Sequence, residues 1–313
     1  MTVKNKWAGA LCLALASGIW GGMYVVSKYV LNFVPPLTLL WLRYMIGFAA
    51  LYALLHAGKK KKGKASLAKK DWLLLAWIGF VGYFASVAMQ FIGTQKADAH
   101  TGAIITSASP VFIVIFARFI LKEKLTARKM LALIIASAGV VIVIGWDIHL
   151  QTYFWGSLIL AGAMITWALL SVYVKVASWK MDSLTITTYA ILFGLLFTTP
   201  FAAREAMMAW PVSSGGFWGM AGILYLGVIS TAGAFFLWNK GLEMVEAGSG
   251  SLFMFLQPVT GSFLGWLLLH ESLNGRFFAG GALILAAIAI SLLPERMRLV
   301  PRMETQKKYI GLK

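Results

Sequence analysis

DAHTGAIITSASPVFIVIFARFILKEKLTAR, residues 98–128, is a stretch that the sequence contains twice. Residues 246–276, EAGSGSLFMFLQPVTGSFLGWLLLHESLNGR, follow the same pattern at a constant offset of 148. Each copy begins with small residues, continues as a long apolar segment with a proline, and ends in a charged exit. The residues of the first copy that recur are Ala99, Gly102, Pro110, Val111, Leu121, Glu123, Leu125 and Arg128. The sequence therefore predicts two homologous halves.

The repeat extends toward both ends of the two halves. An offset of 147 pairs Trp20 with Trp167, and Lys28 with Lys175. The composition fits a membrane protein, because 60% of the residues are hydrophobic, only 12% are charged, and mean hydropathy is +0.79. The net charge of +17 is spread between apolar stretches, so it indicates membrane topology and anionic-lipid contact rather than nucleic-acid binding.

Ten segments are long and apolar enough to cross a bilayer as helices, which need about 20 residues each. They span approximately residues 7–30, 36–56, 72–93, 98–121, 127–146, 154–175, 183–203, 217–239, 247–269 and 276–293. Most of the 28 lysine and arginine residues fall on one side if both termini are cytoplasmic. We therefore expect a multi-pass protein of the cell (plasma or inner) membrane with both termini inside.

Five crossings per half make the second half enter the membrane from the side opposite to the first. The predicted fold is thus an all-α membrane protein of ten transmembrane helices, arranged as two inverted five-helix repeats. The first repeat covers residues 1–147, and the second covers residues 148–313 with a short basic cytoplasmic tail. Inverted repeats are typical of secondary transporters that hold substrate near the membrane midplane.

Several motifs resemble one transporter family. They are WGGMYVVSK at residues 20–28, Arg43 in the second segment, and the paired segments SPVFIVIFARFILKEKLT and QPVTGSFLGWLLLHESLN. Together they resemble the drug/metabolite transporter superfamily, specifically its ten-helix EamA-type exporters. The resemblance implies export of amino acids or related small metabolites, with no enzymatic activity. One departure is Ala190, which stands in the second half where Arg43 stands in the first.

Two prolines, Pro110 and Pro258, are predicted near the middle of their helices. Proline removes one helical hydrogen bond, which frees the carbonyl of Thr106 in the first copy. Such a carbonyl can bind substrate, and the bend can act as a hinge. A kink that only shapes the bundle is the alternative. Ser109 and Gln257 precede the two prolines and are further candidates for substrate contact.

Polar and aromatic residues on other segments complete the predicted substrate site. Tyr83 and Gln90 fall on one helix face, and Thr231 and Trp238 occupy equivalent positions in the second half. Trp20 and Trp167 lie at matching depths, with Tyr24 one turn beyond Trp20, and are candidates for an aromatic wall. Packing and interhelical hydrogen bonding explain these residues equally well without a ligand.

Arg43 is predicted about 10 Å inside its helix end, where a guanidinium needs a partner. It can hold helix-end carbonyls or bind a substrate carboxylate or phosphate. A phosphate would suit a flippase for a phosphorylated lipid or lipid-linked sugar, gripped by Arg43 and Lys28. A membrane scaffold subunit that does not transport is the other alternative.

Absences narrow the chemistry further. No Asp or Glu lies in the middle of a predicted segment, and no spacing of Cys and His suggests a metal site, so neither a metal nor a cofactor is expected. The expected partners are a small-molecule substrate and anionic lipids, the latter along the Lys59–Lys70 loop. A monomer or a homodimer is expected, and the sequence leaves the substrate and its coupling ion open.

Overall fold

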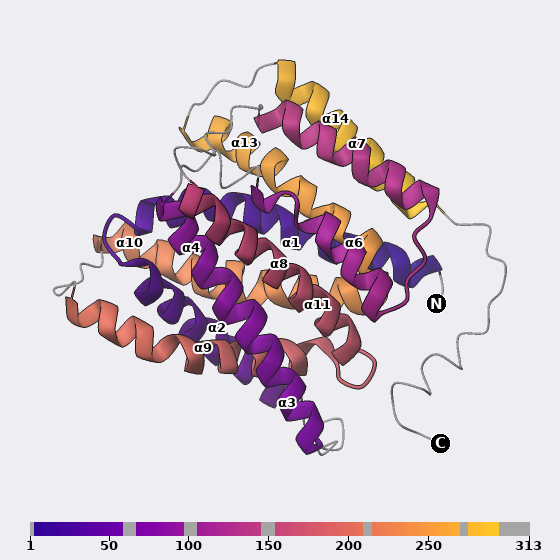
Figure 1. Cartoon of the computed structure of the whole chain (residues 1–313). Helices are drawn as coiled ribbons and strands as arrows, with labels where there is room; N and C mark the ends of the chain where they lie inside the picture. Colours follow the sequence, from indigo (N-terminus) through magenta and orange to yellow (C-terminus); the bar gives the residue numbers. More distant parts are fainter. Residues whose placement is uncertain are drawn as a thin grey trace.

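The computed structural model describes residues 3–58, 67–96, 105–144, 154–208, 215–269 and 275–293. All regular secondary structure in these ranges is helical (Figure 1). In the first half of the chain the helices are α1 (Val3–Val30), α2 (Pro36–Gly58), a long helix formed by α3 (Lys69–Ile78), η2 (Gly79–Ser86) and α4 (Val87–Lys96), then α6 (Ser109–Ile120) and α7 (Ala127–Ile144).

The second half repeats this order. Its helices are α8 (Phe154–Ala177), α9 (Ser183–Met208), a long helix formed by α10 (Gly216–Leu224), η3 (Tyr225–Gly233) and α11 (Ala234–Met244), a broken helix formed by α12 (Ala247–Ser251), η4 (Leu252–Phe255) and α13 (Leu256–Leu269), and α14 (Gly275–Leu292). These helices lie over the segments predicted from hydropathy. The main difference is the segment predicted at 98–121, where α6 begins only at Ser109 and residues 97–104 lie outside the described part.

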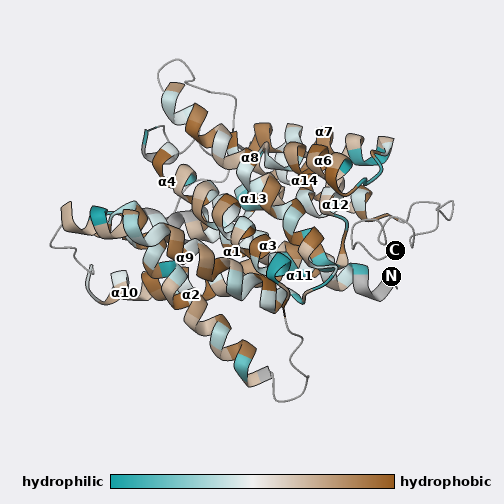
Figure 2. Cartoon of the chain, turned by 60° about the horizontal axis from the view of Figure 1, so that its bottom comes forward, coloured by the Kyte–Doolittle hydropathy of each residue, from teal (hydrophilic) through white to brown (hydrophobic). Residues whose placement is uncertain are grey.

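Among the described residues, six helices are long and apolar enough to span a membrane, and they cover residues 36–57, 69–93, 154–177, 183–208, 216–244 and 275–292. The protein is therefore a multi-pass membrane protein. Its outer surface agrees with this, since large apolar side chains such as Trp7, Leu11 and Leu15 are exposed on α1. Hydrophobic residues predominate along most helices of the bundle (Figure 2). In lipid this exposure carries no penalty, and the helices satisfy their backbone hydrogen bonds internally.

Small residues let the helices approach closely. A Cβ atom built on Gly139 of α7 would lie 2.8 Å from the carbonyl oxygen of Gly280 on α14, which shows how tightly these two helices pack side by side (Figure 1). A Cβ on Gly47 of α2 would lie 3.2 Å from the carbonyl oxygen of Gly227 in η3. Close contact at glycine is how membrane helices gain packing energy when the surrounding lipid is as apolar as their side chains.

The helices form two packing units, and each unit mixes segments from both halves of the chain. In bundle A, α1 and α2 pack against η3, α11 and α13. In bundle B, α8 and α9 pack against η2, α4 and α6. The pair α2–α9 joins the two bundles, and the pair α7–α14 packs against η4 and α13. The pattern of contacts in one bundle is the pattern in the other with the halves exchanged.

Two π-helical segments, η2 and η3, interrupt the long helices at equivalent places in the two halves. In η3 the side-chain hydroxyl of Thr231 donates to the carbonyl of Leu226, five residues earlier, at 2.7 Å. π-helices are rare in proteins, and those that occur are often located at functional sites. Hydropathy alone does not predict them, because the local apolar pattern remains that of a buried helix.

Candidate functional site

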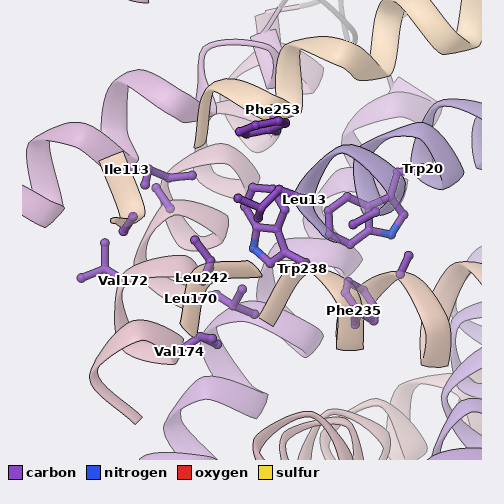
Figure 3. Packing of buried hydrophobic residues seen from close by; sticks show 14 of the residues in the cluster. Leu13, Trp20, Ile113, Leu170, Val172, Val174, Phe235, Trp238, Leu242 and Phe253 are labelled. Atoms are coloured by element: carbon purple, nitrogen blue, oxygen red, sulfur yellow. The ribbon is translucent and has the colours of Figure 1, made fainter. Parts of the chain in front are cut away.

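An aromatic cluster lies where the two bundles meet. It contains Trp20 of α1, Trp167 of α8, and Phe235 and Trp238 of α11. The ring centroids of Trp20 lie 5.3 Å from those of Trp167 and 5.5 Å from those of Trp238. Trp20 is 4% exposed and Trp238 is fully buried (Figure 3). The structure thus brings together the three tryptophans that the sequence predicts for the site, and adds Phe235, which the sequence analysis missed.

The three indole N–H groups of this cluster differ in their hydrogen bonding. Trp20 donates from Nε1 to the backbone carbonyl of Ser230 at 3.2 Å. The buried Nε1 atoms of Trp167 and Trp238 have no hydrogen-bond partner among the described residues. Buried donors are normally satisfied, so this pair of indole N–H groups is a candidate for contact with a bound molecule.

Arg43 lies beside the aromatic cluster and is 1% exposed. Its Nε donates to the Thr231 hydroxyl at 3.1 Å, and its Nη2 lies 3.3 Å from the sulfur of Met23 and 3.5 Å from the hydroxyl of Ser230. Arg43 therefore contacts the side-chain hydroxyl of Ser230, and Trp20 contacts the backbone carbonyl of the same residue. This places a positive charge next to the aromatic cluster, a neighbour that the sequence analysis did not predict for Arg43.

A second network joins Asn239 of α11 to bundle B. The Nδ2 of Asn239 donates to the Tyr83 hydroxyl at 3.1 Å and to the Thr187 hydroxyl at 2.9 Å. The Tyr44 hydroxyl donates to the backbone carbonyl of Tyr83, and the Tyr83 ring packs 4.8 Å from that of Phe235. All four polar residues are fully buried. The Oδ1 of Asn239 has no partner among the described residues.

This network was only partly predicted. Tyr83 is a predicted site residue and Asn239 stands beside the predicted Trp238, whereas Tyr44 and Thr187 were not predicted. The signal that they shared was a polar side chain inside an apolar segment, which in a membrane helix indicates an inward-facing position. Asn239 directly follows Trp238, so that the two residues present an indole and an amide from the same turn of α11.

The remaining predicted residues lie on the adjoining helices. Gln90 is half-buried on α4, and Gln257 is half-buried near the start of α13. A Cβ on Gly21 of α1 would lie 2.7 Å from the backbone oxygen of Gln257, so the α13 backbone closely approaches α1 near the aromatic cluster. The side chains of Tyr24 and Lys28 and residues 59–66 of the lysine-rich loop lie outside the described part of the chain.

The two prolines occupy different positions from those expected. Pro110 is the second residue of α6, after a turn at residues 107–108, and Pro258 is the third residue of α13, after the 3₁₀ segment η4. They therefore begin helices, where the missing N–H costs little, and do not kink the middle of a continuous helix. The Thr106 carbonyl accepts a hydrogen bond from the Ser109 hydroxyl at 2.6 Å, so the acceptor predicted for substrate is used within the protein.

Metal chemistry has no support in this region. No group of three or more His, Cys, Asp or Glu side chains that could hold a metal ion occurs among the described residues. The site instead offers aromatic faces, indole and guanidinium donors, and an amide oxygen. These groups are suited to binding a small polar molecule with an apolar part, not to breaking bonds in it.

Comparison with known proteins gives the family. The profile of the EamA-like transporter family matches residues 7–145 and 154–293. Transporter YetK of Bacillus subtilis (strain 168) is 29% identical and covers 94% of this chain and 89% of its own. Transporter YoaV of the same organism is 24% identical, with 86% and 91% covered, and Protein PecM of Dickeya dadantii (strain 3937) is 25% identical, with 90% and 93% covered.

Structural comparison agrees at the level of the fold. A crystal structure of a protein with 22% sequence identity covers 93% of this chain and 100% of its own, with a TM-score of 0.76. This likeness shows a shared fold, whereas the sequence profile covers most of the chain in two successive matches. The chain belongs to the EamA-like transporter family and is a membrane transporter.

Proposed function

We propose that the protein is a secondary transporter that exports amino acids or related small metabolites by alternating access. The observation that carries the proposal is the buried cluster of Trp20, Trp167 and Trp238, to which both bundles contribute. A site built by two bodies can bind substrate and then open toward either side as the bodies move relative to each other. The family membership supports transport, and the chemistry of the cluster supports the substrate class.

The ten-helix, inverted-repeat architecture is part of this proposal. It is supported by the two family matches, by the paired π-helical segments and by the exchanged contacts of bundles A and B. We infer that the moving bodies are these two mixed bundles, not the five-helix halves at residues 1–147 and 148–313. The pair α2–α9, which joins the bundles, would then be the contact about which they rock. Pro110 and Pro258, proposed as hinges, lie in the first turns of α6 and α13, directly after the irregular segments that precede these helices.

The substrate class follows from the polar groups around the aromatic wall. A carboxylate can accept hydrogen bonds from the indole N–H groups of Trp167 and Trp238, while the guanidinium of Arg43 lies close by. The Oδ1 of Asn239 can accept one from an ammonium or hydroxyl group. An apolar or aromatic side chain would pack on the tryptophan rings. Together these groups match a neutral amino acid or a similar small carboxylate.

Two alternatives fit less well. A flippase for a phosphorylated lipid would need its cationic residue to face the route of the headgroup, yet Arg43 is 1% exposed and bonded to Thr231 and Ser230. A scaffold subunit would have no need for the buried indole N–H groups of Trp167 and Trp238, which have no partner among the described residues. In the cell, we propose that both termini are cytoplasmic, that the Lys59–Lys70 loop contacts anionic lipids, and that the transporter is a monomer or a homodimer.

The proposal is tested with purified protein in liposomes. Competition by a panel of amino acids, with and without a pH gradient, identifies the substrate and any proton coupling. We expect Trp167→Phe and Trp238→Phe, which keep a ring but lose the N–H, each to weaken binding about tenfold, the effect of roughly one hydrogen bond. Trp7→Phe is the matched control, because Trp7 is 62% exposed at the bundle surface.

Two results would contradict the proposal. Unchanged binding in both Trp167→Phe and Trp238→Phe would show that the indole N–H groups do not contact substrate. Failure of every amino acid to compete would remove the substrate class, even if other compounds were transported.

A further inference from the structure

A corner between α11 and α12, at Val245–Glu246, is held by charged side chains from other parts of the chain. Glu123, in the stretch between α6 and α7, accepts the N–H of Ala247 at Oε1 (2.7 Å) and the N–H of Gly248 at Oε2 (3.0 Å). These are the first two residues of α12, whose N–H groups have no acceptor within the helix. The carboxylate of Glu123 therefore supplies the acceptors that the start of α12 lacks.

Two lysines hold the other groups of the same corner. Lys129 of α7 is 7% exposed, and its Nζ lies 2.7 Å from a carboxylate oxygen of Glu246 and 3.7 Å from one of Glu123. Lys175 of α8 donates from Nζ to the carbonyls of Leu242 (2.6 Å), Glu243 (3.2 Å) and Val245 (2.9 Å) at the end of α11. A cation thus binds the carboxyl end of α11, where the helix carbonyls are unsatisfied.

The way α6 ends positions Glu123 for this contact. Lys122 adopts a left-handed conformation, with φ of 55°, and the Glu123 N–H bonds back to the carbonyl of Ala117 at 3.1 Å. Reversal by a left-handed residue is a common way to end a helix. We call the set Glu123, Lys129, Lys175 and Glu246 the corner clasp.

The corner clasp joins the two bundles. Its corner belongs to bundle A, through α11 and the helix that continues into α13. Glu123 and Lys175 belong to bundle B, through α6 and α8, and α6 also packs directly against α12. Charged contacts of this kind differ from apolar packing, because their groups regain hydration when water reaches them. A clasp of charges can therefore open and reform at the water-facing end of a bundle.

We propose that the corner clasp is a gate of the transport cycle, formed while bundles A and B are closed at this end and broken when they part. This inference rests on the alternating access proposed above. Hydrogen bonds of 2.6–3.2 Å do not survive a separation of even a few ångströms. Opening this end of the site therefore requires Glu123 and Lys175 to release the corner.

A within-bundle ion pair provides a matched control. Asp71 of α3 and Lys180, which follows α8, form an ion pair at 3.9 Å. Both residues lie on segments of bundle B, since α3 packs against α8 and α9. A link between these two positions joins two segments of bundle B and should leave the motion between the bundles unchanged. A link across the corner clasp should hold bundles A and B together.

The test cross-links each pair in a Cys12→Ser background. Glu123→Cys/Ala247→Cys, which replaces a contact of 2.7 Å between the bundles, and Asp71→Cys/Lys180→Cys are treated in proteoliposomes with the same short, reducible bis-methanethiosulfonate reagent. Mass spectrometry confirms each link. We expect the clasp link to lower amino-acid transport by about tenfold or more, with recovery on reduction, and the control link to change it by less than about twofold. Full transport by the linked clasp variant would overturn the gate.

A second readout needs no transport substrate. Ser249 lies just behind the clasp on α12 and is 8% exposed. In detergent-solubilised protein, Lys129→Gln should speed maleimide labelling of Ser249→Cys about fivefold or more, while Lys180→Gln should leave it unchanged, because an exposed pair contributes little. If the protein transports no amino acid even after its cross-link is reduced, but Lys129→Gln still speeds the labelling of Ser249→Cys, the gate is supported and the proposed function fails. Unchanged labelling in Lys129→Gln would refute the gate.

Discussion

Asn239→Leu tests whether the buried amide holds the two bundles together. Leucine has nearly the same size and shape as asparagine, so the substitution opens little cavity and removes mainly the hydrogen bonds. Asn239 is fully buried, and its Nδ2 bonds to Tyr83 at 3.1 Å and to Thr187 at 2.9 Å. Thr187 keeps a second bond, to the carbonyl of Ser183 at 2.6 Å. The main loss therefore falls on the Tyr83 hydroxyl.

The expected loss of stability can be worked from these contacts. Interhelical hydrogen bonds in membrane proteins contribute on average about 0.6 kcal/mol and at most about 1.7 kcal/mol each. Two such bonds give about 1–2 kcal/mol for Asn239→Leu. Tyr83→Phe removes one of the two from the other side. The double variant should then show a coupling energy of about 0.6 kcal/mol or more, because the two substitutions remove one shared bond.

The measurement is unfolding in mixed micelles with increasing denaturing detergent, followed by tryptophan fluorescence. Each variant is compared with the wild type at the same micelle composition. Additive effects of Asn239→Leu and Tyr83→Phe, with no coupling, would refute the bond between these side chains. A gain in stability for Asn239→Leu would show that the unsatisfied Oδ1 costs more than the two bonds contribute.

Three further predictions concern packing, capping and pH. In the same detergent-unfolding assay, Gly280→Ala should destabilise the protein by about 1–3 kcal/mol, because the new Cβ would lie 2.4 Å from the Gly139 carbonyl oxygen. Gly275→Ala is the control and should be neutral, since its Cβ would meet nothing within 4 Å. Glu205→Ala should cost about 1 kcal/mol in that assay, since Glu205 accepts an N–H from the first turn of α2 at 2.7 Å. Burial and the charge of Glu246 raise the pKa of Glu123, although Lys129 lowers it, so folding favours the protonated form of this carboxyl group. The melting temperature of the wild type should therefore rise as pH falls toward 4.5. The melting temperature of Glu123→Gln, which cannot titrate there, should rise less. Equal pH profiles would contradict this.

Much of the fold follows from hydropathy and the internal repeat, because long apolar runs in lipid have few alternatives to helices. The positions of α2, α8 and α9 match their predicted segments closely. The break before Pro110 was not predicted, since a proline in an apolar run is equally consistent with a bend and with the start of a helix. Local sequence did not decide between them, but the turn at residues 107–108 did.

The site was predictable in its aromatic part and less so in its polar part. The repeat paired Trp20 with Trp167. Trp238 was predicted because it occupies, in the second half, the position equivalent to Gln90 in the first. Tyr44 and Thr187 were missed because their roles depend on which helices pack across the bundle interface. The mixing of halves in bundles A and B could not be read from the sequence, since the repeat gives equivalence between segments and not contact between them.

The paired π-helical segments carry a consequence for the history of the chain. A π-helical turn corresponds to one residue more than an α-helix of the same length needs, so it records an insertion that rotates everything after it. Here η2 and η3 carry that surplus residue at the same place in both halves. On the repeat that we propose, the insertion is older than the duplication, and a single five-helix ancestor already had it. Deleting one residue from η3 should therefore turn Trp238 and Asn239 about 100° away from their partners. The deletion would remove from the second half the extra residue that both halves inherited from that ancestor.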